Sequence, residues 1–287
     1  MNTEHILCPA DVRRRFDRAA ASFDGADFVH RTTCEGLLER LQPVLIEARA
    51  VVDLGCATGS ATADLARRFK AARILAVDVS RPMLERCRAK QGWFSKTRIL
   101  QADAMALPFA DQSIDVVFSN LLLPWLDDPA RLAAEVGRIL RKDGLFFFSS
   151  LGPDSLLALR NAWRAIDEQQ HVNRFLDMHD LGDALVQAGL RDPVLDVDRL
   201  SVTYEDADSL FHDLTAAGGR NALQGRARGL LGKARFAALR NGLEAARKDG
   251  RIHLDLELVY GHCWGSGVAA SGGDIRINPG SISVRRR

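Results

Sequence analysis

A glycine turn that joins a buried strand to a helix constrains this chain more than any other stretch. Residues 51–60 read VVDLGCATGS, an apolar run that leads into two glycines. Ser60 suits the N-cap of a following helix, whose apolar residues would face the sheet. Glycines let the backbone approach a ligand closely, and a helix N-terminus offers that ligand unpaired N–H groups. The stretch therefore predicts a strand–turn–helix unit that binds a nucleotide, or else a tight turn without a ligand.

The spacing of the two glycines distinguishes two kinds of nucleotide site. In the dinucleotide fingerprint G-x-G-x-x-G the last glycine stands sixth from the first, a position that holds Ser60 here, while the glycine comes one residue earlier, at Gly59. The spacing matches instead the D-x-G-x-G-x-G turn of S-adenosylmethionine (SAM)-dependent methyltransferases, with Ala57 in place of the middle glycine. Asp53 fits that turn, because its carboxylate would face the cationic amino-acid end of SAM, directly or through water.

Three further apolar runs predict strands that end in polar residues, at Asp78, Asp103 and Asn120. In an open parallel sheet the carboxyl ends of the strands line one crevice, which is where ligands bind. This convergence is more specific than any single motif.

Asp78 is the strongest individual candidate of the three. It stands nineteen residues after Gly59, close to the separation at which a strand-end acid meets ribose hydroxyls in βαβ folds. A carboxylate accepts from both hydroxyls at once, although an exposed strand-end acid is the plain alternative. Met83 follows shortly after, and its thioether would lie against adenine or else in the ordinary core.

Composition places the chain among soluble globular proteins. It has 287 residues, of which 47% are hydrophobic and 26% charged, and no run approaches the roughly 20 apolar residues of a membrane span. The first residues lack a basic segment followed by an apolar core, so no signal peptide is expected. Five cysteines, without C-x-x-C spacing, indicate reduced thiols in the cytoplasm and no metal site.

Positive charge is concentrated in one stretch near the C-terminal end, although the net charge is only +2. Between Gly218 and Arg251 only Glu244 and Asp249 oppose nine basic residues: Arg220, Arg226, Arg228, Lys233, Arg235, Arg240, Arg247, Lys248 and Arg251. Such an excess predicts an acidic partner, or merely the solvated face of a helix.

With these residues in view, the chain resembles the class I SAM-dependent methyltransferases over about Val51 to Leu151. The motifs that carry the resemblance are Asp53-x-Gly55-x-Ala57-x-Gly59, Asp78-Val79-Ser80-Arg81-Pro82-Met83, Asp103-Ala104 with Leu107-Pro108-Phe109, and Arg141-Lys142-Asp143-Gly144. The resemblance implies a Rossmann-like α/β fold, with a mostly parallel seven-stranded sheet, helices on both faces and a helical lid insertion. It also implies SAM as the cofactor.

The resemblance assigns roles by position. It makes Asp78 the ribose ligand, Asp103 and Ala104 the adenine ligands, and Asn120 with Leu121 the floor beside the methyl group. The whole set of expected cofactor contacts is Asp53, Gly55, Cys56, Ala57, Gly59, Asp78, Val79, Met83, Asp103, Ala104, Asn120 and Leu121. The alanine at 57 departs from the family pattern, a modest change if the turn keeps a negative φ there. Phe23, where the family often has tyrosine, is the second departure.

Two weaker signatures narrow the resemblance to the malonyl-[acyl-carrier-protein] O-methyltransferases of biotin synthesis. Residues 15–24 read RFDRAAASFD, and Asn161-Ala162-Trp163 leads to HVNRF at 171–175. This narrower resemblance implies methylation of the free carboxylate of malonyl-acyl-carrier protein, an early step toward pimelate. It also implies acyl carrier protein, or malonyl-coenzyme A, as the partner, with no nucleic acid and no membrane.

The expected reaction explains why no catalytic constellation is evident in the sequence. A malonyl carboxylate is ionised at pH 7 and needs no general base, so in-line positioning would supply most of the catalysis. Something cationic must still hold that carboxylate, and Arg174 is the candidate because a guanidinium matches a carboxylate bidentately; a helix-end salt bridge is the alternative. For the acidic carrier protein the expected contacts are Arg220, Arg226, Arg228, Lys233 and Arg235.

The sequence also predicts an organisation in three parts. These are an N-terminal helical cap over residues 1–44, a methyltransferase domain over 45–265 with a basic helical insertion around 205–251, and a flexible tail over 266–287. The cap would serve packing alone or lie as a flap over the cofactor.

Three rival functions stay open. A different small methyl acceptor would use the same SAM half, and a relative of the arginine-hydroxylating assembly factors of respiratory complex I would share the fold. A non-enzymatic scaffold would tolerate loss of the strand-end acids, which are all present. A DNA or RNA methyltransferase is disfavoured, because NLLL stands at 120–123 in place of a D/N-P-P-Y/F tetrapeptide.

Overall fold

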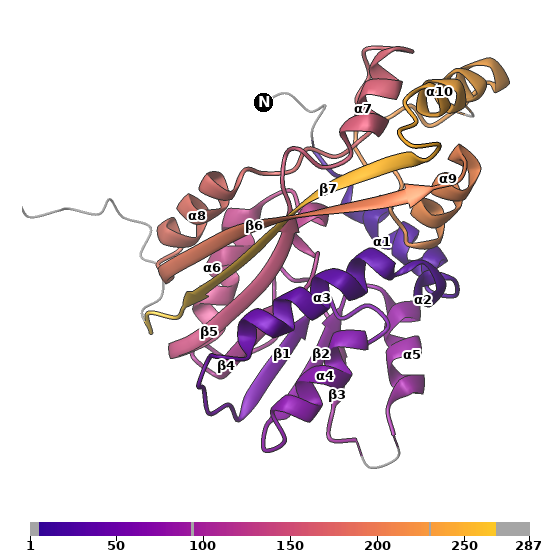
Figure 1. Ribbon diagram of the computed structural model, residues 1–287. Coiled ribbons are helices and arrows are strands. Elements are labelled where there is room, and N and C mark those ends of the chain that lie inside the picture. Colours follow the sequence, from indigo (N-terminus) through magenta and orange to yellow (C-terminus); the bar gives the residue numbers. More distant parts are fainter. Residues whose placement is uncertain (1–5, 93–94, 230, 268–287) are drawn as a thin grey trace, which may run out of the picture.

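In the computed structural model of the protein, which describes residues 6–92, 95–229 and 231–267, helices cover both faces of a seven-stranded sheet (Figure 1). The order of the strands is β3-β2-β1-β4-β5-β7-β6. The first five run parallel, whereas β7 is antiparallel to both β5 and β6. Their bounds are β1 Ala50–Leu54, β2 Arg73–Asp78, β3 Arg98–Gln101, β4 Ile114–Ser119, β5 Leu140–Leu151, β6 Arg191–Tyr204 and β7 Ile252–Trp264. The predicted fold class is confirmed.

Strand β1 lies in the middle of the parallel part and is buried along its whole length. Val52 pairs with Leu75 of β2 on one side and with Val117 of β4 on the other. Parallel strands that are covered on both faces read as continuous apolar runs, and this is why the sequence revealed them so clearly.

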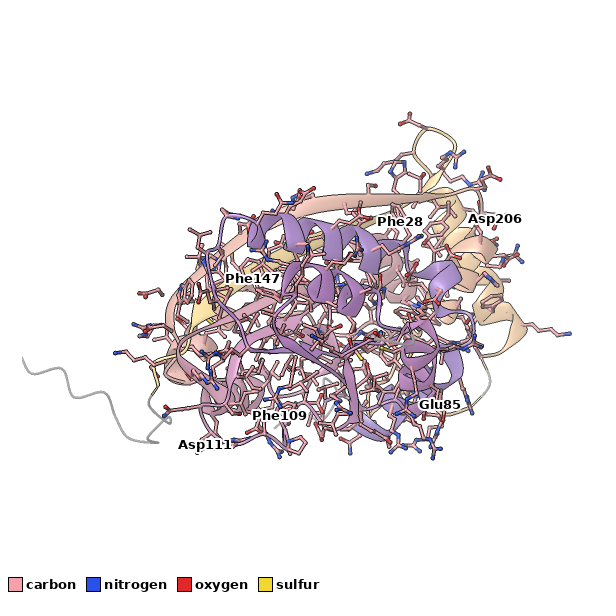
Figure 2. All side chains as sticks on the ribbon, turned by 90° about the horizontal axis from the view of Figure 1, so that it is seen from below. Phe28, Glu85, Phe109, Asp111, Phe147 and Asp206 are labelled. Atoms are coloured by element: carbon pink, nitrogen blue, oxygen red, sulfur yellow. The ribbon has the colours of Figure 1, made fainter. Side chains whose placement is uncertain are left out.

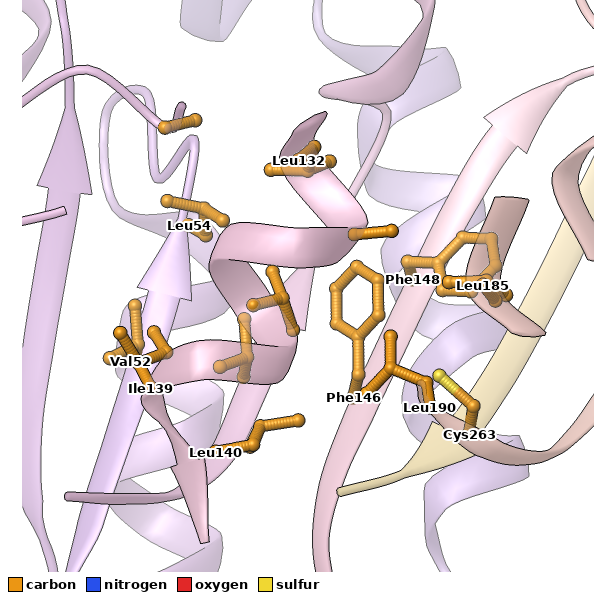
Figure 3. Close-up of a cluster of buried hydrophobic side chains, with 14 of the residues drawn as sticks. Val52, Leu54, Leu132, Ile139, Leu140, Phe146, Phe148, Leu185, Leu190 and Cys263 are labelled. Carbon is orange, nitrogen blue, oxygen red and sulfur yellow. The ribbon is translucent and has the colours of Figure 1, made fainter. Parts of the chain in front are cut away.

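Two helices pack on one face of the sheet, α6 (Pro129–Ile139) and α8 (Met178–Gln187). Figure 3 shows this layer, in which Ile139 of α6 lies beside Val52 of β1 and Leu185 of α8 lies beside Phe148 of β5. The opposite face is covered by α3 (Phe28–Leu41), α4 (Ser60–Arg68) and α5 (Arg81–Lys90). Burial of these two apolar layers, at about 25 cal/mol per Å² of apolar surface, is the main force that holds the layers together.

The N-terminal helices extend the second layer. They are α1 (Pro9–Ala19), the short α2 (Phe23–Ala26) and α3. The Ser80 hydroxyl donates to Asp17 of α1 at 2.7 Å, and the Thr58 hydroxyl donates to Asp24 of α2 at 2.5 Å. These bonds fasten the N-terminal helices to the turns that follow β1 and β2.

A second group of helices lies beside the antiparallel end of the sheet: α7 (Leu157–Arg164), α9 (Ala207–Ala216) and α10 (Lys233–Ala245) (Figure 1). A separate apolar cluster joins them to β7, and it includes Leu159, Leu210, Leu239 and Leu254. Helices α9 and α10 lie between β6 and β7 in the chain, at the position of the expected insertion.

This helical group meets the N-terminal helices. The Ser22 hydroxyl donates to the carbonyl of Ala216 at the end of α9, at 3.1 Å. Phe28 and Asp206 are labelled on the same side of the molecule in Figure 2, and both line one surface groove. The N-terminal helices and the insertion therefore close over the sheet together.

Three further results concern the expectations. Ser60 is the first residue of α4 rather than its N-cap, because Gly59 occupies the cap position in a left-handed conformation and no side chain caps the helix. Residues 268–287 of the expected tail lie outside the described residues. Among the described helices, none is long and apolar enough to span a membrane.

Candidate functional site

A cavity opens at the carboxyl ends of the parallel strands, and we call it the strand-end cavity. The turn after β1 and the ends of β2, β3 and β4 form its floor, and the N-terminal helices form its roof. Eight of the twelve predicted cofactor residues line it: Gly55, Ala57, Asp78, Val79, Asp103, Ala104, Asn120 and Leu121. Phe16, Phe23 and Trp125 complete its apolar wall.

Every second residue of the glycine turn adopts the left-handed conformation: φ is 75° at Gly55, 45° at Ala57 and 84° at Gly59. The condition under which the alanine would be a modest change, a negative φ at residue 57, is therefore not met. An L-residue pays about 1–2 kcal/mol for this conformation. The main-chain N–H of Ala57 donates to the Asp78 carboxylate at 2.9 Å, a charge-assisted bond that offsets the cost.

Gly59 serves packing as well as conformation. It does not line the strand-end cavity, and a Cβ added there would collide with the Sγ atom of Cys87 on α5. The turn can therefore come this close to α5 only because residue 59 has no side chain.

Asp78 lies at the centre of the strand-end cavity. One carboxylate oxygen accepts from Ala57, and the other accepts from the main-chain N–H of Ser80 at 2.8 Å. Burial raises the pKa of Asp78, while these two main-chain bonds lower it. Each oxygen keeps a further lone pair for a donor in the cavity.

A small recess beside the glycine turn contains Asp53, Cys56 and Arg31. The Thr62 hydroxyl donates to the Asp53 carboxylate at 2.5 Å, and Asp53 has no ion pair within the described residues. Burial raises the pKa of Asp53 to about 7, and the nearby charge of Asp78 adds to the increase. A cationic group of a ligand in this recess would restore the ordinary ionisation of the carboxyl.

His30 lies where three hollows meet, since it lines the strand-end cavity, the recess beside Asp53 and a second large cavity. Its Nδ1 is buried and has no hydrogen-bond partner in the protein. Burial lowers the pKa of His30 to about 4, so the imidazole is neutral at pH 7. The Asn120 side-chain amide donates to the His30 carbonyl at 2.8 Å and ties α3 to the end of β4.

Leu121 forms part of the same junction and is itself strained. Its φ is 53°, and its main-chain N–H donates to the buried hydroxyl of Ser149 at 2.9 Å. The same hydroxyl donates to the side-chain Oδ1 of Asn120 at 2.7 Å. Strain that the surroundings hold in place is common where a backbone must be presented to a ligand.

The second large cavity, which we call the apolar cavity, lies on the other side of this junction. His30, Leu121 and Trp125 line both cavities and form the wall between them. Most of its other lining residues are apolar, and they include Leu159 of α7, Leu214 of α9, and Leu254 and Leu256 of β7. Arg220 is the one Lys or Arg side chain among the described lining residues, and Asn173, Tyr204 and Asn221 add uncharged polar groups.

Two predicted contacts lie elsewhere. Met83 is fully buried in a cluster with Ala19, Ala20 and Phe23, so its thioether packs beneath α1 and does not line the strand-end cavity. Arg174 is exposed and lines a shallow polar groove on the outer surface, not the apolar cavity. The expected grip of Arg174 on a substrate carboxylate finds no support in this position.

Much of the basic stretch is paired within the molecule. Arg226 pairs with Asp11, Arg235 with Asp167, and Arg240 with Asp208 at 2.9 Å. Arg247 and Arg251 also have acidic partners. Within the described residues Arg220, Arg228, Lys233 and Lys248 have no ion pair, so the positive charge available to a partner is smaller than the sequence suggests.

His30, Arg31, Phe16 and Trp125 were missed in the sequence as candidate site residues. His30 and Arg31 stand in a helix without motif, and they reach the site only because α3 packs across the end of β4. Within the described residues no three His, Cys, Asp or Glu side chains are grouped so that they could hold a metal ion.

Comparison with known proteins agrees with this geometry. The methyltransferase domain family matches residues 52–148. A malonyl-[acyl-carrier protein] O-methyltransferase of Gallionella capsiferriformans is 40% identical and covers 91% of this chain and 92% of its own. One of the same name from Halorhodospira halophila is 40% identical over 96% of both chains. The crystal structure of the YcgJ protein from Bacillus subtilis, 16% identical, superposes with a TM-score of 0.59 and covers 82% of this chain and 98% of that one.

The fold and the strand-end cavity define a class I SAM-dependent methyltransferase. Identity of 40% over nine-tenths or more of the chain narrows the class, and the chain belongs to the malonyl-[acyl-carrier protein] O-methyltransferase family.

The residues present fit the cofactor, SAM. Asp78 offers free lone pairs to ribose hydroxyls, and the buried Asp53, which lacks a cation, would meet the ammonium of the amino-acid end. Arg31 lines the same recess and would face the cofactor carboxylate. Asp103 and Ala104 lie at the far end of the cavity, where adenine would sit.

Proposed function

We propose that this enzyme transfers the methyl group of SAM to the free carboxylate of malonyl-acyl-carrier protein and forms a methyl ester. The observation that carries the proposal is the wall shared by two cavities, built from His30, Leu121 and Trp125. An acceptor in the apolar cavity would reach the methyl donor in the strand-end cavity where the two cavities adjoin, beside these three residues. The names of the relatives supply the acceptor, and the cavities supply a place for it.

The reaction requires the protein mainly to position the acceptor carboxylate against the methyl donor. SAM, when bound, supplies an already activated methyl group on a sulfonium. The malonyl carboxylate is ionised at neutral pH, so no residue has to remove a proton. The enzyme has to hold the carboxylate in line and keep water away from it, and positioning of this kind contributes up to about 7–11 kcal/mol in favourable cases.

His30 is the residue best placed to position the acceptor. A neutral imidazole carries one N–H donor and one acceptor nitrogen, and this ring faces both cavities while its Nδ1 has no partner. We assign it the role of donating a hydrogen bond to the acceptor carboxylate. Its low pKa means that it does so without titrating near pH 7.

The N-terminal helices and the insertion have separate roles in this proposal. We propose that the N-terminal helices, within residues 1–44, act as a roof over the cofactor, because Phe16, Phe23 and His30 close the strand-end cavity. The insertion around 205–251 acts as a lid over the acceptor, because Leu214, Ala217 and Arg220 line the apolar cavity.

The test is incubation with methyl-labelled SAM and a panel of malonyl-, succinyl- and acetyl-carrier proteins, followed by mass spectrometry. We expect one methyl group on the malonyl thioester, released as methanol by mild base. Acetyl-carrier protein, which has no carboxylate, serves as the control. Transfer to a different acceptor in the absence of transfer to malonyl-carrier protein would replace the proposed substrate.

A further inference from the structure

Three arginines lie close together beside the apolar cavity, and we call them the arginine cluster: Arg15 of α1, and Arg220 and Arg226 after α9. The Arg15 guanidinium donates to the carbonyl of Asn221. Arg220 lines the apolar cavity and has no ion pair among the described residues. Arg226 pairs with Asp11 at 2.5 Å, and both side chains are largely buried.

The end of α9 fixes the position of this cluster. Gly218, at a φ of 77°, ends the helix, and the N–H of Gly219 donates to the carbonyl of Leu214 at 2.7 Å. A Cβ at Gly218 would lie 3.0 Å from the ring of Phe16. The turn therefore packs against α1, and the Arg15 side chain reaches Asn221, the residue after Arg220, both of which line the apolar cavity.

The cluster carries more positive than negative charge. The pKa of Arg15 is lowered by burial first and then by repulsion from Arg226 and Arg220. Among the described residues Asp11 is the one carboxylate that pairs with the cluster, and it already serves Arg226 and Arg14; Asp213 also lines the apolar cavity but forms no ion pair with the cluster. The Nε atom of Arg15 is buried without a hydrogen-bond partner. Guanidinium groups left in this state favour an oxyanion, which they bind with two parallel hydrogen bonds.

We propose that Arg15 and Arg220, supported by Arg226, form a subsite for an oxyanion carried by the acyl substrate. This inference rests on the proposed function for the identity of that substrate. A malonyl thioester on a pantetheine arm carries two such groups, the terminal carboxylate and the phosphate at the other end of the arm. Both groups present the same chemistry to a guanidinium, and the experiment separates them.

The experiment measures binding to the enzyme saturated with S-adenosylhomocysteine, so that no turnover is needed. Four probes are compared by calorimetry: acetyl-pantetheine, malonyl-pantetheine, and the 4′-phosphorylated form of each. The proteins are wild type, Arg220→Gln and Arg15→Gln. Arg88→Gln is the matched control, because Arg88 is exposed on α5, has no ion pair among the described residues and does not line either cavity.

We expect one anionic group to strengthen binding to wild type by about tenfold, and Arg220→Gln to abolish that gain while Arg88→Gln keeps it. Loss of the gain from phosphate places the phosphate in the subsite, and loss of the gain from malonyl places the carboxylate there. An unchanged gain from both groups in Arg220→Gln and Arg15→Gln overturns the proposal. Circular dichroism and the affinity for S-adenosylhomocysteine exclude a folding defect.

Failure of the proposed function has a different signature. If wild type methylates no malonyl thioester in the acceptor panel but still binds the phosphorylated probes through Arg220, the subsite stands and the acceptor is wrong. If malonyl-carrier protein is methylated while no anion effect depends on the arginines, the function stands and the subsite falls.

Discussion

Carboxylates without a cation partner dominate this site at the scale of single residues. Asp78 and Asp53 are held by main-chain N–H groups and by one hydroxyl, and both have pKa values raised by burial. Such groups lower the stability of the empty protein but bind a cationic or hydroxyl-bearing ligand strongly. Three predictions follow from single side chains.

The first prediction concerns Asp78, the expected ribose ligand. Asp78→Ala should weaken SAM binding by about 1.5–3 kcal/mol, because charge-assisted hydrogen bonds are lost. Titration calorimetry measures the change, and Asp64→Ala on α4 is the matched control, because the half-buried Asp64 pairs with Arg67 and does not line the strand-end cavity. Because Asp78 also holds Ala57, the conservative Asp78→Asn variant separates loss of charge from collapse of the turn. Equal affinity in all three variants and wild type would remove the ribose assignment.

The second concerns His30. His30→Phe keeps the ring and the main-chain bond to Asn120 but removes the donor, so kcat/KM for malonyl-carrier protein should fall about 10–100-fold. His30→Gln, which still donates, should restore most of that loss, whereas SAM affinity should stay within about twofold in both variants, as expected when no cofactor hydrogen bond is lost. If the His30→Phe and His30→Gln variants have the same kcat/KM, the imidazole contributes packing and no hydrogen bond.

The third concerns the pH dependence of stability. The folded pKa of Asp53, about 7, lies above the ordinary 3.8 of the unfolded chain, so the folded state holds the proton more tightly. Its contribution to stability is fully present below pH 3.8 and is lost as the pH rises to about 7. Asp53→Asn removes this dependence. The stability of the variant relative to wild type should therefore increase by about 2 kcal/mol between pH 5 and 7.5.

Chemical denaturation of the cofactor-free proteins at each pH measures this difference. Saturating SAM should reduce it, since the cofactor ammonium would stabilise the ionised carboxylate. A difference that does not vary with pH would mean that Asp53 is ionised throughout.

At the scale of elements, the contact between the glycine turn and α5 decides how the cofactor cavity is shaped. Gly59 caps α4 at a positive φ and lies against Cys87 of α5. One residue therefore fixes both the start of α4 and the distance between the glycine turn and α5. The cost of a side chain there has two separable parts, the left-handed conformation and the collision with the thiol.

Gly59→Ala should therefore lower the free energy of unfolding by roughly 2–5 kcal/mol. In a Cys87→Ala background the cost should fall to the conformational part, about 1–2 kcal/mol. Gly25→Ala, where a Cβ meets nothing within 4 Å, is the control and should change stability little. A cost that is unaffected by Cys87→Ala would show that the turn moves away from α5.

At the scale of the whole molecule, the distribution of charge matters more than its sum. Helix α10 carries three of the nine basic residues, Lys233, Arg235 and Arg240, and the other six lie in the segments after α9 and after α10. Three arginines of the stretch form internal ion pairs with Asp11, Asp167 and Asp208, and these pairs connect the insertion to α1, to the segment after α7 and to α9. Arg228, Lys233 and Lys248 are exposed and have no ion pair among the described residues, so they are available to an acidic carrier protein.

Rising ionic strength should therefore increase KM for malonyl-carrier protein steeply and KM for malonyl-coenzyme A only slightly, because salt screens association between two charged surfaces. Arg228→Glu with Lys233→Glu should produce the same selective increase at low salt. The two KM values, measured from about 20 to 500 mM salt, which spans Debye lengths of roughly 20 to 4 Å, give the comparison. A parallel response of both substrates would place the docking surface elsewhere.

The sequence by itself determined the parallel half of the sheet and much of the strand-end cavity. Strands buried on both faces are continuous apolar runs, and their polar ends fall on one edge because parallel strands align their carboxyl ends. Asp78, Asp103 and Asn120 could therefore be placed in one cavity from spacing alone, and the structure places them there.

Only the tertiary structure decided the rest, since contacts between distant segments leave no local pattern. His30 reaches the junction through α3, ninety residues from Asn120, and Arg15 meets Asn221 across 206 residues. Met83 and Arg174 have suitable chemistry and suitable positions in the sequence, but the direction of each side chain is set by neighbours that spacing does not reveal. The grouping of Arg15, Arg220 and Arg226, which we propose as an anion subsite, likewise depends on packing, because Gly218 lies against Phe16 of α1 and Arg220 lines the apolar cavity.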